Sequence, residues 1–146
     1  MNWLTKNWRG LLVLALGLTV LGLTHFVLHS CADVGHLMKT SMGTEVPMRC
    51  SWTERAVQGM GGLVAVFGLL MLFLPRLAQG LSLAAGFTGV LMFATPLWLI
   101  PTCADPMMTC NMSLKPGSLL LGALVTVAGF AGTLTIRTFE GRRALA

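Results

Sequence analysis

The sequence predicts an all-α membrane protein, a bundle of four transmembrane helices. Hydrophobic residues make up 55% of the chain and charged residues 10%, with a mean hydropathy of +0.77, which is too apolar for an ordinary soluble domain. Four runs without charge, at 11–28, 56–74, 77–100 and 118–136, are long enough to cross a hydrocarbon core of about 30 Å as helices. A helix pairs all its backbone amides internally, as lipid demands.

An internal repeat predicts how these helices are connected. The loop after the first run begins with C-A-D at Cys31 and ends with M-R-C at Cys50, and the loop after the third run begins with C-A-D at Cys103 and ends with M-T-C at Cys110. The pattern indicates two parallel two-helix units within a single membrane domain. The predicted limits are 1–146 for the domain, 9–74 and 77–137 for the repeats, and 138–146 for a tail. The first loop carries an insert near residues 35–46.

The basic residues predict which ends of the helices face the cytoplasm. Six of them flank the side that carries both termini, namely Lys6, Arg9, Arg76, Arg137, Arg142 and Arg143. With Glu140 this side has a net charge of +5, whereas the four basic and four acidic residues of the other side cancel. The positive-inside rule therefore predicts that both termini lie in the cytoplasm and both cysteine loops outside. The expected location is the bacterial inner (cytoplasmic) membrane, with the cysteine loops periplasmic or extracellular. We expect the positive charge to interact with the lipid bilayer and not with a nucleic acid.

Local signals mark the ends of the helices. Ser51 and Glu54 form an S-x-x-E capping box, which predicts the start of the second helix. Pro75 predicts a tight turn before the third helix, Pro96 a kink within it, and Pro116 the first turn of the fourth. Small residues four positions apart predict close packing between helices, at Gly61/Ala65, Ser82/Gly86, Ala85/Gly89, Ser118/Gly122 and Ala128/Gly132.

The four cysteines suggest a disulfide-stabilised cap. Cys31, Cys50, Cys103 and Cys110 all lie in the loops predicted to be outside, where the compartment is oxidising. Four cysteines allow three pairings. Because only six residues separate Cys103 from Cys110, the loop lengths favour one disulfide within each loop.

A second interpretation of the same loops is a Cu(I) site. Six of the ten methionines lie there, including the duplicated Met48 and Met108, and sulfur ligands suit Cu(I). His25 and His29 are four positions apart at the end of the first run, so they share a helix face. The candidate metal ligands are therefore these two methionines, these two histidines and the four cysteines.

A third interpretation is thiol–disulfide exchange. Four helices with one cysteine pair per outer loop resemble in layout the quinone-linked disulfide oxidases and the vitamin K epoxide reductase relatives. Neither loop has the C-x-x-C motif that makes a pair exchange readily.

Catalysis and ion transport are not predicted. No Asp, Glu, Lys or Arg lies within the four runs, whereas ion and proton transporters usually carry such groups at mid-membrane. No motif resembles a nucleophile and base pair, a phosphate-binding loop or a nucleotide-binding fingerprint, so the sequence offers no catalytic residue and no organic cofactor site.

The segments beside the cysteines resemble a known family. Met48-Arg49-Cys50-Ser51-Trp52-Thr53 before the second helix, and the spacing of Pro101, Cys103 and Cys110 before the fourth, are similar to small bacterial and archaeal four-helix membrane proteins known only as a domain of unknown function. A histidine commonly follows the second cysteine in that family, where this chain has Ser51. Members look like companions of ABC transporter permeases of the lipoprotein-release and macrolide-export type. The resemblance implies a non-enzymatic accessory subunit of a larger membrane complex.

Overall fold

The computed structural model describes residues 2–26, 38–39, 41–43, 45–46, 49–100 and 110–144, with side chains described within 7–26, 41–43, 51–100 and 111–134. Its helices are α1 (Asn2–Phe26), α2 (Arg49–Phe73), α3 (Ala78–Ala94) and α4 (Lys115–Ala144). Each forms most of a segment that is long and apolar enough to cross a membrane. The predicted fold of four membrane helices is confirmed, and it indicates a multi-pass membrane protein.

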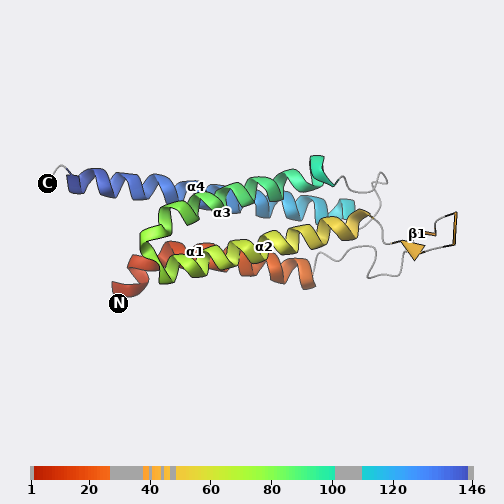
Figure 1. The fold of residues 1–146 in the computed structure, drawn as a ribbon, viewed down its shortest axis with the longest axis horizontal. Coiled ribbons are helices and arrows are strands. Elements are labelled where there is room, and N and C mark those ends of the chain that lie inside the picture. The colour runs from red at the N-terminus through yellow and green to blue at the C-terminus, as the bar shows by residue number, and fades with distance from the viewer. Residues whose placement is uncertain are drawn as a thin grey trace.

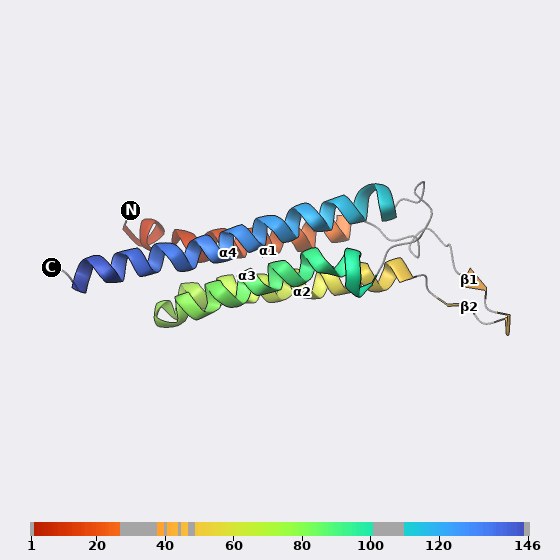
Figure 2. The same cartoon turned by 90° about the horizontal axis from the view of Figure 1, so that it is seen from above.

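The four helices run side by side along the long axis of the molecule (Figure 1). The start of α1 and the end of α4 lie at one end, here called the terminal end. The end of α1, the start of α2 and the segments that follow α3 and precede α4 lie at the other, here called the loop end. Seen from above, α1 and α4 form one layer and α2 and α3 the other (Figure 2). Consecutive helices are therefore neighbours, and α4 closes the bundle against α1.

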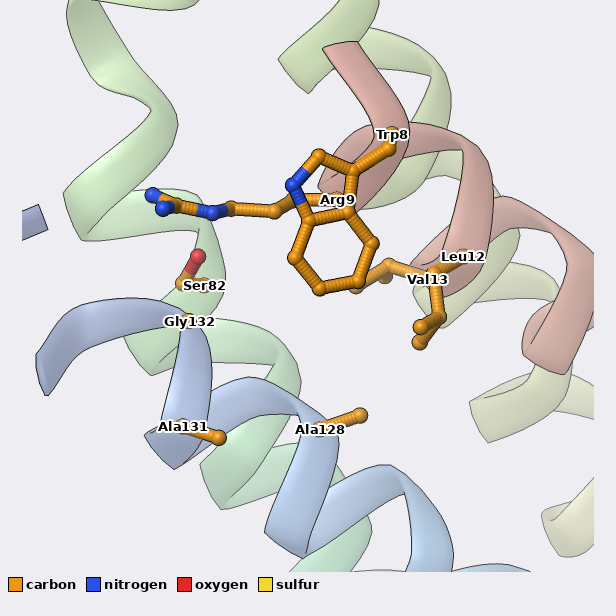
Figure 3. A pocket seen from close by; sticks show the side chains of 8 residues that line it. All are labelled: Trp8, Arg9, Leu12, Val13, Ser82, Ala128, Ala131 and Gly132. Carbon is orange, nitrogen blue, oxygen red and sulfur yellow. The ribbon is translucent and has the colours of Figure 1, made fainter. Parts of the chain in front are cut away.

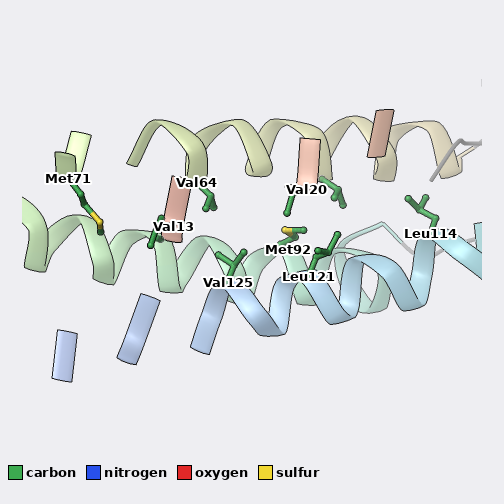
Figure 4. Packing of buried hydrophobic residues seen from close by; sticks show 10 residues of the cluster. Val13, Val20, Val64, Met71, Met92, Leu114, Leu121 and Val125 are labelled. Atoms are coloured by element: carbon green, nitrogen blue, oxygen red, sulfur yellow. The ribbon is translucent and has the colours of Figure 1, made fainter. Parts of the chain in front are cut away.

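Each helix buries a stripe of residues that recurs every seven positions, as in bundles with coiled-coil-like packing. On α1 the stripe consists of Gly10, Val13, Gly17, Val20 and Thr24. On α2 it includes Val57, Gly61, Val64, Gly68 and Met71. Apolar side chains from all four helices meet in a row along the bundle axis (Figure 4).

Glycines bring α1 and α2 into backbone contact. A Cβ atom on Gly17 would lie 2.7 Å from the Cα of Ala65, and one on Gly61 would lie 2.5 Å from Cγ1 of Val20. Val20 therefore fills the space that a glycine leaves on the facing helix. The predicted close packing at Gly61/Ala65 is confirmed, and it is possible because at each of these crossings one of the two helices presents a glycine.

The same contacts recur between α3 and α4. Gly89, 72 positions after Gly17, would place a Cβ 2.5 Å from the backbone nitrogen of Thr126, which stands 61 positions after Ala65. A second contact has the same two offsets, that of Gly129 with Gly86, which matches Gly68 with Leu14. The fold thus repeats one helix hairpin in one register, while the exact limits of the repeats stay a prediction.

The spacing between corresponding residues of the two repeats is one residue shorter at the second cysteine of each loop than in the helix that follows. Cys110 follows Cys50 by 60 positions, whereas Thr126 follows Ala65 by 61. The segment η3 (Cys110–Leu114) is a π-helix that leads into α4. A π-turn takes one residue more than an α-turn, so η3 accounts for the difference.

Prolines shape both ends of α3. The 3₁₀ turn η1 (Pro75–Leu77) joins α2 to α3, as predicted from Pro75. At the loop end α3 passes into the π-helix η2 (Thr95–Leu99), which contains Pro96, and the Ile100 N–H donates to the Thr95 carbonyl at 2.8 Å. The predicted irregularity at Pro96 is therefore a change of helix type.

A small hairpin, which the sequence did not predict, lies in the insert of the first loop. Strands β1 (Met38–Lys39) and β2 (Glu45–Val46) pair antiparallel, with Met38 opposite Val46. Gly43 in the turn has a φ of +78°, a left-handed conformation that favours glycine. The hairpin lies beyond the loop end of the bundle (Figure 1).

Candidate functional site at the loop end

The helices bring the predicted site residues to a common end where the structure describes them. Cys50 is the second residue of α2 and Cys110 the first of η3, so the backbones of both lie at the loop end, where α1 also ends at Phe26 (Figure 1). The side chains of these two cysteines lie outside the described ones. The remaining predicted ligands apart from His25 are outside the described residues altogether, namely Cys31, Cys103, His29, Met48 and Met108. The disulfides and the Cu(I) site therefore stay predictions.

A hydrogen bond joins the bases of the two cysteine loops. Thr53 is fully buried, and its Oγ1 donates to the carbonyl of Ile100 at 3.2 Å. Thr53 stands three positions after Cys50, and Ile100 stands three positions before Cys103. The end of the first loop and the start of the second are thus held together by a buried side chain.

Other buried hydroxyl groups at this end are satisfied locally. Thr95 Oγ1 donates to the Leu91 carbonyl at 2.7 Å and lies 3.8 Å from Met60 Sδ. Thr24 Oγ1 donates to the Val20 carbonyl at 2.8 Å. Hydroxyls that donate in this way to the preceding helical turn are common where helices bend.

Glu54 is a buried carboxyl group that the sequence analysis placed differently. Its side chain is 8% exposed, and Gln58 Nε2 donates to its Oε1 at 3.4 Å. The charge-free run was predicted at 56–74, and the capping box predicted that the helix itself starts at Ser51. In the structure α2 begins at Arg49, two residues before Ser51, and the apolar segment Ser51–Phe73 includes Glu54. The seven-residue spacing of the buried stripe could have predicted the burial of Glu54, since Glu54 stands seven positions before Gly61.

A hollow of about 350 Å³ lies beside His25, between α1 and α2. Leu21, Gly22, Phe26 and Gln58 complete its lining. The imidazole is exposed and meets the Phe26 ring edge to face, with centroids 5.1 Å apart. Because Gln58 also contacts Glu54, its amide connects the hollow to the buried carboxyl group.

The metal prediction has no geometric support within the described part of the chain. Among those residues, no group of three or more histidine, cysteine, aspartate or glutamate side chains could hold a metal ion. Of the predicted ligands, His25 is the one whose side chain is described. A site of the predicted composition would have to be completed by the loops.

Comparison with known families assigns the chain to a family without assigning a function. Residues 13–135 match the family model described as "Domain of unknown function (DUF4418)". No curated protein and no solved structure matches the chain. The match confirms the expected relationship to a family known only as a domain of unknown function.

Proposed function

The chain belongs to the DUF4418 family, whose description is a domain of unknown function, so we propose a role from the geometry of the chain itself. The proposed role is that of a small, non-enzymatic accessory subunit of a larger membrane complex. The observation that carries the proposal is the tight packing within each hairpin. Gly17 and Gly89 each place a helix backbone against the next helix, so the hairpins leave no conduit at these crossings. Every buried side-chain nitrogen and oxygen among the described residues has a hydrogen-bond partner. Such an interior supports a scaffold whose work is done at its surfaces.

One surface suits a partner helix. On the outward face of α2, a Cβ atom on Gly59 or Gly62 would meet no atom within 4 Å, and the neighbouring Leu63 and Val66 are about half exposed. Small residues between apolar ones let a second helix approach closely in lipid, where hydrophobicity alone does not drive association. We call Gly59, Gly62, Leu63 and Val66 the open face of α2.

The partner we propose is a membrane permease, with an ABC transporter permease as the first candidate. The family resemblance to companions of such permeases supports this choice. We place the protein in the bacterial inner membrane with the loop end outside, where a disulfide-closed cap would present the two loops to periplasmic parts of the complex.

Co-purification tests the proposal. A tagged chain, expressed at its native level and extracted in a mild detergent, should carry a permease in a fixed ratio. The double substitution Gly59→Leu with Gly62→Leu should reduce the permease by about tenfold or more, because it fills the open face. Gly80→Leu is the matched control, since Gly80 is also exposed and its Cβ would also meet nothing. A chain that purifies alone, or a complex equally sensitive to both substitutions, contradicts the proposal.

A second candidate function is a Cu(I)-binding or thiol-redox protein. The Thr53–Ile100 hydrogen bond supports this candidate, because it links the end of the loop that carries Met48 in the sequence to the start of the loop that carries Met108. Replacing both methionines by leucine should keep their packing volume and abolish copper retention in protein purified without chelators. Equal Cu(I) retention by the variant, or no stoichiometric copper in the parent, contradicts this candidate and leaves the accessory role.

A further inference from the structure

A hollow of about 120 Å³ opens near the terminal end, where α1 passes the α3–α4 hairpin (Figure 3). Trp8, Arg9 and Leu12 line it from α1, while Ala128 and Ala131 line it from α4. It lies at the opposite end of the bundle from the cysteine loops and has no part in the proposed accessory role.

The hollow exists because α4 presents small residues both to α3 and to α1. Gly129 brings α4 against Gly86, and Gly132 brings it against Ser82, so the α3–α4 contact is tight. The adjoining positions on α4, toward α1, are alanines. Ala128 was expected to contribute to close packing, but it is half-buried and its methyl group is too small to fill the gap to α1.

The side of the hollow nearer the helix ends is polar and cationic. The Arg9 side chain extends across the opening near Ser82, and the Trp8 indole stands beside it (Figure 3). Arg9 Cζ lies 6.0 Å from the Trp8 ring centroid. Guanidinium groups bind phosphate through several hydrogen bonds, and tryptophan is typical of the membrane interface.

We propose that this hollow binds one anionic phospholipid. Arg9 holds the phosphate group, and part of an acyl chain lies over Ala128 and Ala131. A charged rim above an apolar floor matches the order of charge and hydrocarbon in a phospholipid, whereas a free phosphate ion would gain nothing from the alanines. Five further basic residues on the same side of the predicted topology add long-range attraction for acidic headgroups, namely Lys6, Arg76, Arg137, Arg142 and Arg143.

Native mass spectrometry of the full chain from nanodiscs tests the proposal. The discs contain phosphatidylglycerol and phosphatidylcholine in equal amounts, and the wild-type chain should retain one phosphatidylglycerol in preference. Arg9→Gln should lower this retention by about fivefold or more, because the charged contact is lost. Ala128→Phe should lower it similarly by filling the floor. Arg76→Gln is the control, because Arg76 is an exposed arginine at the same end that does not line the hollow.

Three results would overturn the proposal: equal retention of both lipids, retention unchanged by Arg9→Gln and Ala128→Phe, or an equal loss in Arg76→Gln. Displacement of phosphatidylglycerol by millimolar inorganic phosphate would also overturn it, since the site would then recognise the ion alone. If Arg9→Gln fails to insert, the result for Ala128→Phe decides.

Discussion

Single glycines determine how closely the helices of each hairpin approach, and their position matters more than their number. Gly17 and Gly22 lie on the same helix, five positions apart. A side chain at Gly17 would collide with the backbone of Ala65, whereas one at Gly22 would meet nothing within 4 Å. Substitution of Gly17 therefore tests the contact between α1 and α2, and substitution of Gly22 is the control.

Gly17→Ala should lower the free energy of unfolding by about 1–3 kcal/mol, because the added methyl group forces α1 and α2 apart. Gly22→Ala should be neutral or stabilise by up to about 1 kcal/mol, because alanine is the better helix former. Unfolding in mixed detergent micelles measures both. Equal effects of the two substitutions would show that α1 and α2 are not in backbone contact.

The residues that the sequence analysis missed share one physical cause. Close contacts were sought between small residues four positions apart, which found Gly61/Ala65 but not Gly68 or Gly129. These two recur seven positions after Gly61 and Gly122, on the buried stripe. Glu54 was missed for a related reason, because a carboxylate at a capping position is usually exposed and its place on the stripe becomes evident only with the full register.

At the scale of elements, the loop end is held by contacts between segments that are distant in sequence. Thr53 on α2 reaches the carbonyl of Ile100, 47 positions away. Charge-free runs predicted the four helices well, because a membrane span depends on local composition. This hydrogen bond and the π-turn at η3 depend on how the helices pack, so composition and spacing could not predict them.

Thr53→Val should lower the free energy of unfolding by about 1–3 kcal/mol, since it keeps the shape but leaves the Ile100 carbonyl without this donor. Hydrogen exchange should also accelerate in the first turn of α2. Thr19→Val is the control, because exposed Thr19 donates only within its own helix, to Ala15. Identical exchange in both variants would contradict a structural link between the loop bases.

The disulfide prediction is tested on the shorter loop. Non-reducing peptide mapping should find Cys103 joined to Cys110, and Cys103→Ser should destabilise the chain by about 2–3 kcal/mol because the bond constrains the unfolded loop. Cys110→Ser should cost the same, and the double variant no more. Four freely alkylated thiols in native protein would contradict the disulfide-closed cap.

For the whole molecule, the structure shows which helix ends lie together, whereas the side of the membrane that each end faces is predicted from the charges. The start of α1 and the end of α4 lie at one end (Figure 1). The positive-inside rule supplies the side, because the basic excess belongs to the same end. The loop end is therefore expected outside the cell membrane.

Labelling of single cysteines introduced into a background without the native ones tests this orientation. A membrane-impermeant maleimide should label Met42→Cys in intact cells, because Met42 is 90% exposed in the turn beyond β1. Gly80→Cys, near the start of α3 at the terminal end, should react only after the cells are opened. The reverse pattern would invert the topology.

The accessory role makes the strongest claim about the whole molecule, that α2 meets another membrane protein through its open face. A photo-crosslinking amino acid at Leu63 tests it most directly in living cells, with Leu124 on α4 as the control. The two side chains are similarly exposed, at 52% and 55%. The account predicts one discrete adduct of Leu63 with a permease and none of Leu124. Adducts from neither position, or the same adducts from both, would contradict it.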